Sequence, residues 1–326
     1  MPTPSAIPPA ARRTGGLPPG TSCVVLGGGG FIGTHLCRRL AADGMRVLGF
    51  GRRQSFPEAL EGITWLGGDF TDRAALARAV EGAEVVFHLL GGSTPESANI
   101  DPVADLGASA VATLHLLEIC RAAAVRKLVF VSSGGTVYGI PRATPIPEDA
   151  PTDPISAYGI SKLAVEKYLY LYRHLHALDY AVLRVANPFG PYQSPTRRQG
   201  VVAALMHRMM TAQPVEVWGD GQVVRDFVFV EDVAEALVTV AAHDGPQRVF
   251  NVGSGEGRSV NAVIADIAAV LEQPGIVPVH KPARATDVPV SILDIRRIRE
   301  ATGWVPRTPW LAALEATAEW MRHSYR

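Results

Sequence analysis

The chain has 326 residues, with 31 basic and 31 acidic side chains, and is long enough for one large or two smaller domains. This charge balance gives no indication of a protein that binds nucleic acid or a membrane surface. The three cysteines, Cys23, Cys37 and Cys120, form neither a CxxC pair nor a metal-ligand cluster. We therefore expect reduced thiols, no bound metal and a cytoplasmic location. No apolar run approaches 18 residues, so a transmembrane helix is not expected.

Residues 1–20 are rich in Pro, Gly and Ala and lack the apolar core of a signal peptide. We expect this segment to be a disordered tail with no role in the fold. From Thr21 onward, short β-branched runs alternate with longer helical patterns. The pattern predicts strands over 23–26, 46–50, 64–66, 84–89, 127–132 and 180–184, and helices near 31–43, 72–81, 101–124 and 156–178.

Such alternation is typical of parallel βαβ units with right-handed crossovers. The predicted fold is α/β, with a Rossmann-type, doubly wound parallel sheet and a smaller, discontinuous α/β substrate domain. Residues 21–187, together with about 229–255, form the predicted dinucleotide-binding domain. Segments 188–228 and 256–326, where prolines punctuate a less regular pattern, form the predicted nucleotide-sugar domain. The ligand cleft should open at the carboxyl ends of the parallel strands.

The first predicted strand ends in a glycine-rich turn that leads directly into a helical pattern. Gly27, Gly30 and Gly33 have GxxGxxG spacing, with Phe31 and Ile32 between the last two glycines. Glycine allows a sharp turn and a close approach of the backbone to a ligand. The N–H groups of the following helix favour a phosphate, so this loop is a candidate site for a dinucleotide pyrophosphate.

A second motif stands at the start of the pattern 156–178. Tyr158 and Lys162 are four residues apart, which places both side chains on one helix face. A nearby ammonium group favours the phenolate, so we expect Lys162 to lower the pKa of Tyr158 from about 10. Such a tyrosine can take a proton from a sugar hydroxyl while hydride leaves the same carbon. Lys162 can also donate to the ribose hydroxyls of a nicotinamide cofactor.

Together with several downstream motifs, these features resemble the extended short-chain dehydrogenase/reductase family, of the NAD-dependent epimerase/dehydratase type that includes UDP-galactose 4-epimerases. The resemblance extends from residue 22 to residue 326. In Gly68-Asp69-Phe70-Thr71-Asp72 it implies that Asp69 holds the adenine, with Phe70 beside it. In Val86-Phe87-His88-Leu89 it implies a strand that passes beneath the nicotinamide, with Leu89 at the cofactor.

The resemblance also implies a set of substrate-binding residues. Asn187, at the end of the strand motif Arg184-Val185-Ala186-Asn187, corresponds to an asparagine that contacts the sugar nucleotide. Arg225 and Arg284 correspond to two arginines that bind the diphosphate, which suits the bidentate guanidinium group. Arg284 stands just before Thr286-Asp287-Val288-Pro289, so Asp287 is included in the predicted substrate site.

The chain departs from the family pattern at the catalytic hydroxyl. Aligned on Val137-Tyr138-Gly139, the position of the usual serine or threonine is occupied by Gly134. Ser133 and Thr136 are the candidate replacements, because the neighbouring glycines let the loop bend. The same segment lacks the acidic pair with which the 4,6-dehydratases of the family expel water, which argues against dehydration.

A second departure concerns the cofactor. The strand at 46–50 is followed by Gly51-Arg52-Arg53, where NAD-preferring folds usually carry an acidic residue for the ribose diol. Arg52 could pair with a 2′-phosphate, which favours NADP, whereas epimerases of this type generally keep NAD bound. NAD and NADP therefore both remain open.

A third departure concerns the sugar. Ser291 stands where enzymes restricted to glucose and galactose tend to carry a tyrosine. The smaller side chain indicates a pocket with room for a 2-acetamido group.

The function implied by the resemblance is a nucleotide-sugar 4-epimerase that acts on a UDP-hexose or UDP-N-acetylhexosamine by transient oxidation and re-reduction at C4. Two alternatives remain open. An NADP-dependent 4-ketosugar reductase is indicated by Arg52, and a catalytically silent nucleotide-binding protein by Gly134. The Ala- and Leu-rich patterns at 101–124 and 156–178 correspond to helices that form the dimer interface in this family. We therefore expect a homodimer that binds a UDP-sugar, with no nucleic-acid or membrane partner.

Overall fold

The computed structural model describes residues 16–91, 95–195, 200–283 and 288–325. Its centre is a seven-stranded sheet in the order β10-β6-β5-β4-β1-β2-β3, in which every neighbouring pair is parallel. The strands are β1 (Ser22–Leu26), β2 (Arg46–Gly51), β3 (Thr64–Gly67), β4 (Val85–His88), β5 (Lys127–Ser133), β6 (Asp179–Val185) and β10 (Val249–Val252). The predicted Rossmann-type sheet is confirmed.

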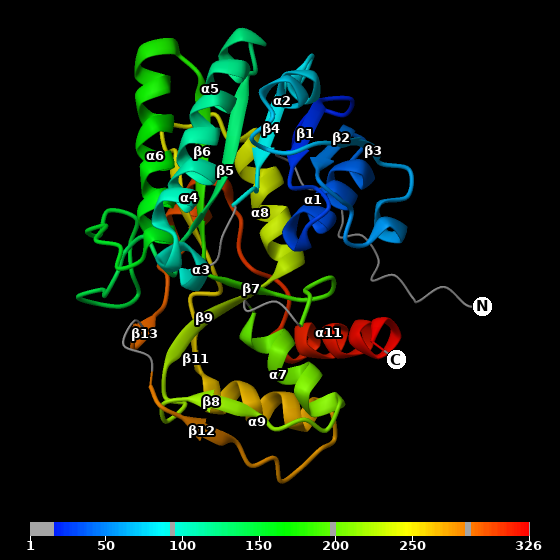
Figure 1. Cartoon of the computed structure of the whole chain (residues 1–326), viewed down its shortest axis with the longest axis vertical. Helices are drawn as coiled ribbons and strands as arrows, with labels where there is room; N and C mark the ends of the chain where they lie inside the picture. Colours follow the sequence, from blue (N-terminus) through cyan, green and yellow to red (C-terminus); the bar gives the residue numbers. More distant parts are fainter. Residues whose placement is uncertain (1–15, 92–94, 196–199, 284–287, 326) are drawn as a thin grey trace.

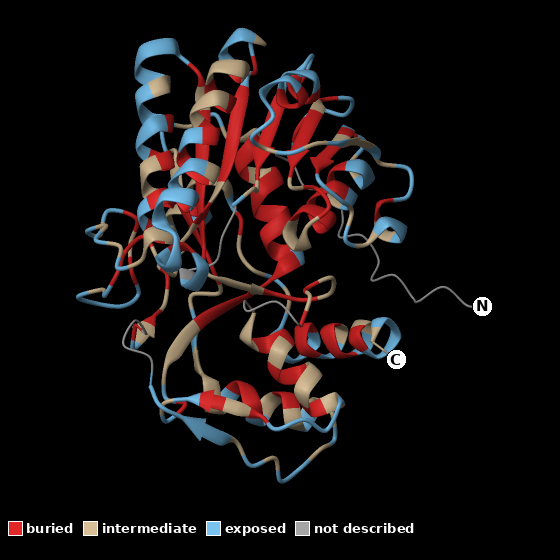
Figure 2. Ribbon diagram, in the orientation of Figure 1, coloured by how far each residue is buried: buried red, intermediate tan, exposed pale blue. Residues whose placement is uncertain are grey.

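Helices cover both faces of this sheet (Figure 1). One face carries α1 (Phe31–Ala42), α8 (Val230–Ala242) and α10 (Arg296–Thr302), and the other carries α2 (Arg73–Val80), α5 (Ala112–Ala122) and α6 (Ala157–His176). A short 3₁₀ helix, η1 (Pro57–Leu60), follows β2. Because both faces are covered, all four residues of β4 are buried, and the sheet is the most deeply buried part of the molecule (Figure 2).

The segment predicted as one helix over 101–124 is divided. After α3 (Pro95–Ile100), α4 (Pro102–Leu106) continues through a π-helical turn, η2 (Gly107–Val111), into α5. By length and composition alone, the run Pro102–Ala122 could cross a membrane, which corrects the expectation that no apolar segment is long enough. In the fold α5 packs against α2 and α6, and its residues Leu116, Leu117 and Cys120 are buried in the core.

The carboxyl ends of the parallel strands face a smaller α/β unit, the lower part of the molecule in Figure 1. One of its sheets has the order β11-β9-β13, with β7 also pairing with β9, and the other consists of β12 and β8. The strands are β7 (Asn187–Phe189), β8 (Glu216–Trp218), β9 (Val224–Phe229), β11 (Gly257–Ser259), β12 (Val279–Lys281) and β13 (Val290–Ser291). Its helices are α7 (Val201–Met210), α9 (Val260–Val270) and α11 (Trp310–Ser324).

The chain returns to the large sheet between these elements. Helix α8 follows β9 directly and packs against α1, and β10 pairs with β6, so residues of the range 229–255 return to the large sheet as expected. The domain boundaries at 187, 228 and 255 remain our proposal.

Residues 16–20 correct the expected extent of the tail. Leu17 is only 4% exposed and packs in the core under α1. The Gly20 N–H donates to the carbonyl of Gly44 at 2.9 Å. An apolar side chain and a backbone hydrogen bond thus join this segment to the fold, and residues 1–15 lie outside the described part of the chain.

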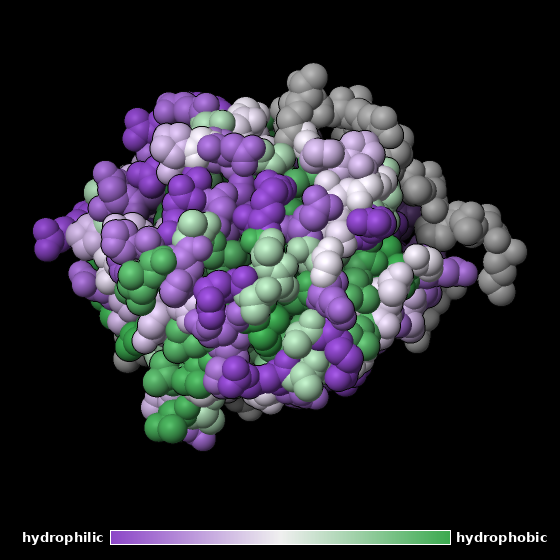
Figure 3. Space-filling model, turned by 90° about the horizontal axis from the view of Figure 1, so that it is seen from above, coloured by the Kyte–Doolittle hydropathy of each residue, from purple (hydrophilic) through white to green (hydrophobic). Residues whose placement is uncertain are grey.

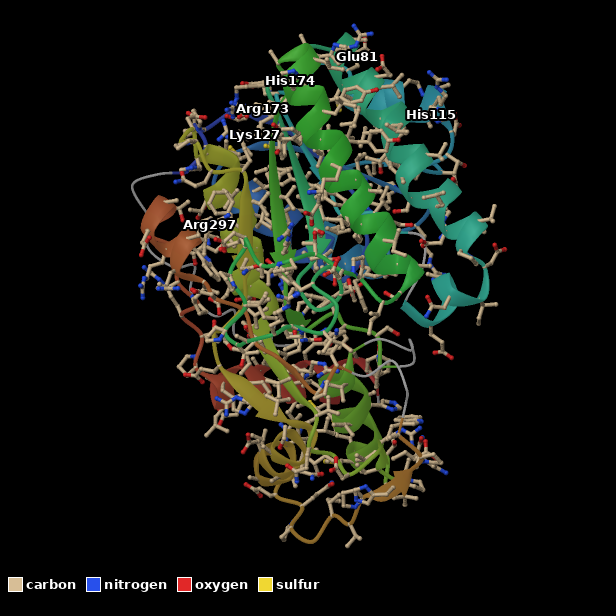
Figure 4. All side chains as sticks on the ribbon, turned by 90° about the vertical axis from the view of Figure 1, so that its left-hand side faces the viewer. Glu81, His115, Lys127, Arg173, His174 and Arg297 are labelled. Atoms are coloured by element: carbon tan, nitrogen blue, oxygen red, sulfur yellow. The ribbon has the colours of Figure 1, made fainter. Side chains whose placement is uncertain are left out.

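An ionic cluster closes the amino-terminal end of β5 and β6. Lys127 is 1% exposed and lies 3.4 Å from Asp179 and 3.5 Å from Asp244. Arg173 and Arg248 also pair with Asp179, and Figure 4 labels Lys127 and Arg173 at this end. Seen from above, hydrophilic and apolar side chains are intermixed over this end of the molecule (Figure 3). The cluster lies far from the strand ends that face the smaller unit.

A second ion pair is buried beneath the carboxyl ends of the strands. Arg184 of β6 donates to Glu166 of α6, with Nη2 to Oε2 at 2.6 Å, and both residues are 5% exposed. Glu166 also accepts from Ser132 Oγ at 2.5 Å, and Arg184 Nη1 donates to the Tyr138 hydroxyl at 2.9 Å. The Tyr138 hydroxyl donates in turn to Asn251 Oδ1 of β10 at 2.7 Å. The network joins α6 to three neighbouring strands.

Replacing Glu166 by glutamine should lower the free energy of unfolding by about 3–5 kcal/mol, because the Arg184 charge stays buried without its counter-charge. Urea unfolding of E166Q and wild type measures this loss. The control is E118Q, which makes the same change at a side chain that is 41% exposed, pairs with Arg121 and accepts from the Tyr172 hydroxyl. It should cost much less, since exposed ion pairs contribute little. Equal losses in the two variants would contradict the assigned importance of the buried pair.

Candidate active site

The glycine loop connects β1 to α1. Gly27 has a φ of +89°, and its N–H donates to the carbonyl of Phe50 in β2 at 2.8 Å. A Cβ added at Gly33 would lie 2.1 Å from the Gly27 carbonyl oxygen, so only glycine permits this approach of helix and turn. Helix α1 begins at Phe31, followed by Ile32, directly after Gly30. Its first N–H groups have no partner within the helix, and this cradle fits a pyrophosphate group.

The segment that follows β4 lies between the glycine loop and the predicted reacting pair, and it is close to both. A Cβ on Gly27 would lie 3.2 Å from Leu90 Cδ2 and 3.5 Å from the carbonyl carbon of Leu89, at the end of β4. A Cβ on Gly91 would lie 3.4 Å from Lys162 Nζ and 4.0 Å from a ring carbon of Tyr158. The order β1-β4-β5 thus brings the loop, the end of β4 and the start of α6 into one continuous surface.

Tyr158 and Lys162 lie together in the first turns of α6, as the spacing of four residues predicts. Ser156 caps this helix by accepting from the Gly159 N–H at 3.2 Å. Lys162 Nζ is 5.7 Å from the centre of the Tyr158 ring and 4.7 Å from that of Phe130. It donates to the Val131 carbonyl of β5 at 3.0 Å. The ammonium group is thus held between the sheet and the phenol.

The expected ionisation of Tyr158 is wrong. Burial raises its pKa to about 12, and the negative charge of Asp105 adds to the shift. Burial also lowers the pKa of Lys162 to about 8, against the opposing effects of Asp105 and Glu166. Loss of water around the phenol therefore outweighs the attraction of the ammonium group.

The two candidate hydroxyls flank Gly134. A Cβ on Gly134 would lie 2.5 Å from Leu293 Cδ1, so this position faces a packed leucine and has no room for a serine side chain. Ser133 is partly exposed at the carboxyl end of β5. Thr136 Oγ1 is buried and has no hydrogen-bond partner among the described residues. Both hydroxyls remain candidates for the role that the family assigns to this loop.

The adenosine end of the predicted cofactor site is formed by the loops after β2 and β3. Gly51 faces Trp65, whose ring would lie 3.5 Å from a Cβ added there. Arg52 is exposed. The pKa of Asp69 is lowered, first by hydrogen bonds from Thr71 and then by the charge of Arg52. Phe70 packs its ring 4.9 Å from that of His88. An exposed arginine near Asp69 is compatible with either cofactor.

Three of the predicted substrate residues meet in the smaller unit. Asn187 Nδ2 donates to the Asp226 carbonyl at 2.9 Å, joining β7 to β9. Arg225 and Ser291 are partners in the register of β9 with β13, and Arg225 also donates to the carbonyls of Val224 and Val288. Ser291 is 5% exposed. The other two predicted residues, Arg284 and Asp287, lie outside the described residues.

Sequence reasoning missed the buried carboxylate of Asp226. Its Oδ1 accepts from the N–H and the hydroxyl of Ser254 at 2.7 Å, and its Oδ2 accepts from the N–H groups of Gly255 and Leu293 at 3.2 Å. A Cβ on Gly253 would lie 2.3 Å from this carboxylate. The carboxylate therefore fixes the loop between β10 and β11. The available signal was an acidic residue directly before the apolar run Phe227–Val230.

A cavity of about 420 Å³ lies apart from these residues. It is lined by Pro147, Glu148, Asp149, Gln247, Asp294, Arg296, Arg297, Glu300 and Ala301. Arg297, labelled in Figure 4, lies 3.4 Å from Glu148, and Arg296 lies 2.6 Å from Asp294. No residue of the predicted cofactor or substrate site lines this cavity. Across the described ranges, no group of three His, Cys, Asp or Glu side chains is placed to hold a metal ion.

The burial of Lys162 predicts a measurable cost in stability. Its folded-state pKa of about 8 lies below the ordinary 10.5, so the unfolded chain binds an extra proton between these values and wild-type stability rises with pH there. K162M should therefore be about 1–3 kcal/mol more stable than wild type at pH 7. Urea unfolding at a series of pH values should show this advantage shrinking between pH 8 and 10.5. A pH-independent difference would contradict the assigned cost.

Comparison with known proteins agrees with this geometry. The model of the NAD-dependent epimerase/dehydratase family matches residues 23–253. A UDP-glucose 4-epimerase from Mycolicibacterium smegmatis is 36% identical over 308 residues, which cover 92% of this chain and 98% of that protein. The crystal structure of a UDP-glucose 4-epimerase with UDP-glucose, from Thermotoga maritima, superimposes with a TM-score of 0.90 at 34% identity and covers 94% of this chain and all of that one.

A further solved structure is the UDP-N-acetylglucosamine 4-epimerase from Methanobrevibacter ruminantium in complex with UDP-N-acetylmuramic acid. It has a TM-score of 0.87 at 27% identity and covers 94% of this chain and 99% of that one. These similarities extend over nearly the whole length of the chain, and they agree with the glycine loop and with the pairing of Tyr158 and Lys162. The chain belongs to the NAD-dependent epimerase/dehydratase family.

Proposed function

We propose that the protein is a nucleotide-sugar 4-epimerase that acts on a UDP-hexose or UDP-N-acetylhexosamine. The observation that carries this proposal is the continuous surface from Gly27 past Leu90 and Gly91 to Lys162 and Tyr158. A dinucleotide bound at the glycine loop would extend along this surface to the reacting pair. The relatives described above carry the names UDP-glucose 4-epimerase and UDP-N-acetylglucosamine 4-epimerase, which supports the same assignment.

Each predicted residue has a role in this reaction. Tyr158, as the phenolate, takes the proton of the C4 hydroxyl, and the positive charge of Lys162 favours this phenolate before the transfer. Ser133 or Thr136 donates a hydrogen bond to the reacting oxygen. The nicotinamide cofactor supplies a reversible hydride acceptor for C4. Because hydride returns to the opposite face of C4, the reaction inverts this carbon without net oxidation.

The smaller unit would hold the nucleotide while the sugar turns. Arg225 and Arg284 bind the diphosphate, and Asn187 contacts the sugar nucleotide, with Asp287 nearby. Binding energy from the nucleotide keeps the ketosugar in place during its rotation, so the sugar itself needs few fixed contacts.

We infer NAD as the cofactor, since the family is described as NAD dependent. Gly27, Gly30, Phe31, Ile32 and Gly33 would hold the pyrophosphate, while Asp69, Phe70 and Leu89 line the adenosine and nicotinamide ends. The exposed Arg52 and the absence of a carboxylate at Gly51 favour a second candidate, an NADP-dependent 4-ketosugar reductase. That enzyme would consume its cofactor in proportion to product, whereas an epimerase recycles it.

We also propose a homodimer formed through the segments 101–124 and 156–178, which contain α4, η2, α5 and α6. Figure 2 shows exposed residues along the outer side of these helices, and several of them are apolar. They include Val103 at 81%, Leu106 at 45%, Val111 at 44%, Leu171 at 40% and Leu175 at 59% exposed. Burial of such a face against a second copy would remove these side chains from water. The cytoplasmic location remains a prediction.

With UDP-N-acetylglucosamine and catalytic NAD, purified protein should form UDP-N-acetylgalactosamine without accumulating reduced cofactor. Y158F should lower kcat about 10²–10⁴-fold, because the proton acceptor is lost. Product analysis by chromatography and the absorbance of reduced cofactor measure both. The matched control is Y170F, on the same helix but 66% exposed, which should keep full activity. Undiminished turnover in Y158F would contradict the mechanism, and stoichiometric NADPH consumption with a 4-ketosugar would favour the reductase.

Ser291 should set the size of the sugar pocket. In S291Y the aromatic ring would fill the space for the 2-acetamido group, lowering kcat/KM for UDP-N-acetylglucosamine roughly a hundredfold while UDP-glucose turnover persists. S291A, which keeps the pocket open, should retain both activities. Kinetics with the two substrates and a matching thermal midpoint for each variant test this. Equal losses on both sugars in a folded S291Y would remove Ser291 from the predicted substrate site.

A further inference from the structure

One leucine packs directly against the loop that carries the candidate hydroxyls. Leu293 is 1% exposed and follows Ser291 of β13 by two residues. A Cβ added at Gly134 would lie 2.5 Å from Leu293 Cδ1 and 3.2 Å from its Cδ2. Leu293 therefore occupies the space in which a side chain at position 134 would stand.

The backbone itself does not require a glycine at position 134. The φ angle of Gly134 lies outside the left-handed region, so a residue with a Cβ could adopt it. Its N–H donates to the Val185 carbonyl at 2.8 Å, a bond that serine would also make. The Arg184 carbonyl oxygen would lie 3.0 Å from the added Cβ, a contact that a shift of a few tenths of an ångström relieves. Leu293 is therefore the main obstacle to a larger residue here.

The adjacent glycine gives a direct comparison. The φ angle of Gly135 also lies outside the left-handed region. No described atom beyond its chain neighbours lies within 4 Å of a Cβ added there. The same substitution should therefore be tolerated at position 135 and resisted at position 134.

Backbone contacts hold Leu293 in place from two sides. Its N–H donates to Asp226 Oδ2 of β9 at 3.2 Å. On the other side it forms a parallel bridge with Ile146, whose N–H donates to the Ile292 carbonyl at 2.8 Å. The leucine is thus attached both to the strand that carries Arg225 and to the loop that follows the catalytic turn.

The side chains of this segment point alternately to its two sides. Ile292 packs toward β11, because its Cδ1 would lie 2.6 Å from a Cβ added at Gly257. Leu293 packs the other way, against Gly134. Alternation along an extended segment places Ser291 on the same side as Leu293. The predicted sugar-pocket residue and the leucine behind the catalytic turn therefore belong to one short segment.

The loop that Leu293 contacts is a tight turn at the end of β5. The N–H groups of Thr136 and Val137 both donate to the Ser133 carbonyl, at 3.2 and 3.1 Å. Val137 and Tyr138 form a buried apolar cluster with Leu293. The leucine thus packs against Gly134 within the turn and against the two residues that follow it. Its position affects where the hydroxyls of Ser133 and Thr136 lie.

We propose that Leu293 is a positioning residue of the epimerase reaction. It fills the space of the hydroxyl side chain that the family carries at position 134, and it supports the turn from which Ser133 or Thr136 reaches the reacting oxygen. This inference rests on the proposed function. The glycine at position 134 and the bulk of Leu293 are a size-matched pair, so that each residue explains the other.

Urea unfolding without substrate tests the size match. G134S should lower the unfolding midpoint by roughly 0.3–1 M, because the added side chain overpacks the site. The matched control G135S should leave the midpoint near the wild-type value, since the space there is open. In the L293A background, G134S should instead raise the midpoint, because it fills part of the cavity left by the leucine.

Kinetics with UDP-N-acetylglucosamine test the positioning role. L293A should lower kcat about 10–100-fold through misplacement of the turn, with KM nearly unchanged because Arg225 and the nucleotide contacts remain. Adding G134S to L293A should raise kcat roughly tenfold, whereas G134S in wild type should lower it. The control L314A removes an equally buried leucine from α11 and should lower the urea midpoint without lowering kcat.

The effect of G134S must therefore change sign when Leu293 is removed. Equal effects of G134S in the two backgrounds would overturn the proposal. So would an L293A variant whose kcat falls no further than that of L314A. If L293A fails to fold, L293V leaves a smaller cavity and carries the same test.

The two measurements also separate this inference from the proposed function. If wild type turns over no UDP-sugar, the proposed function fails, while the size match is decided by the urea midpoints alone. If wild type epimerises its substrate but G134S lowers kcat equally with and without Leu293, the function stands and the role of Leu293 fails.

Discussion

The buried charge of Arg184 is the constraint on which the arrangement of the active site depends. A guanidinium group in the interior is tolerated only when its hydrogen bonds and its charge are met, and here Glu166 and the Tyr138 hydroxyl meet them. Because Glu166 lies on α6, this requirement fixes the rotation of that helix about its axis. Tyr158 and Lys162 precede Glu166 by two turns and one turn, so the same fixed rotation directs both toward the end of β4.

The large sheet could be predicted because its signal is local and repeated. Strands β1, β2, β5 and β6 begin and end within one or two residues of the predicted ranges, since apolar runs between helical patterns mark them clearly. The return of β10 to this sheet agrees with the assignment of about 229–255 to the large domain. The strands of the smaller unit have two to six residues, too short for a period to appear, and were not predicted individually. The π-helical turn at Gly107–Val111 has no sequence period that distinguishes it from a helix.

The sequence predicted which residues lie together in the site, but not the pKa values of their side chains. Spacing alone indicates that Lys162 lies beside Tyr158, but it says nothing about how much water surrounds either group. The raised pKa of Tyr158 comes first from burial and second from Asp105, which is 53 residues away along the chain. The reason for a glycine at position 134 could not be predicted from the sequence either. Its neighbour Leu293 is distant in sequence, and only the fold reveals that this glycine faces a packed side chain.

The carboxylate of Asp226 gives strand β9 a second use. Arg225 and Asp226 are consecutive, so their side chains project from opposite faces of the strand. One face carries Arg225, which is predicted to bind the diphosphate. The other face carries Asp226, which accepts hydrogen bonds from the loop between β10 and β11. The strand therefore connects the predicted diphosphate contact directly to the segment where the chain crosses between the two units. Because Arg225 and Asp226 are adjacent, any displacement of β9 would also move the loop between β10 and β11.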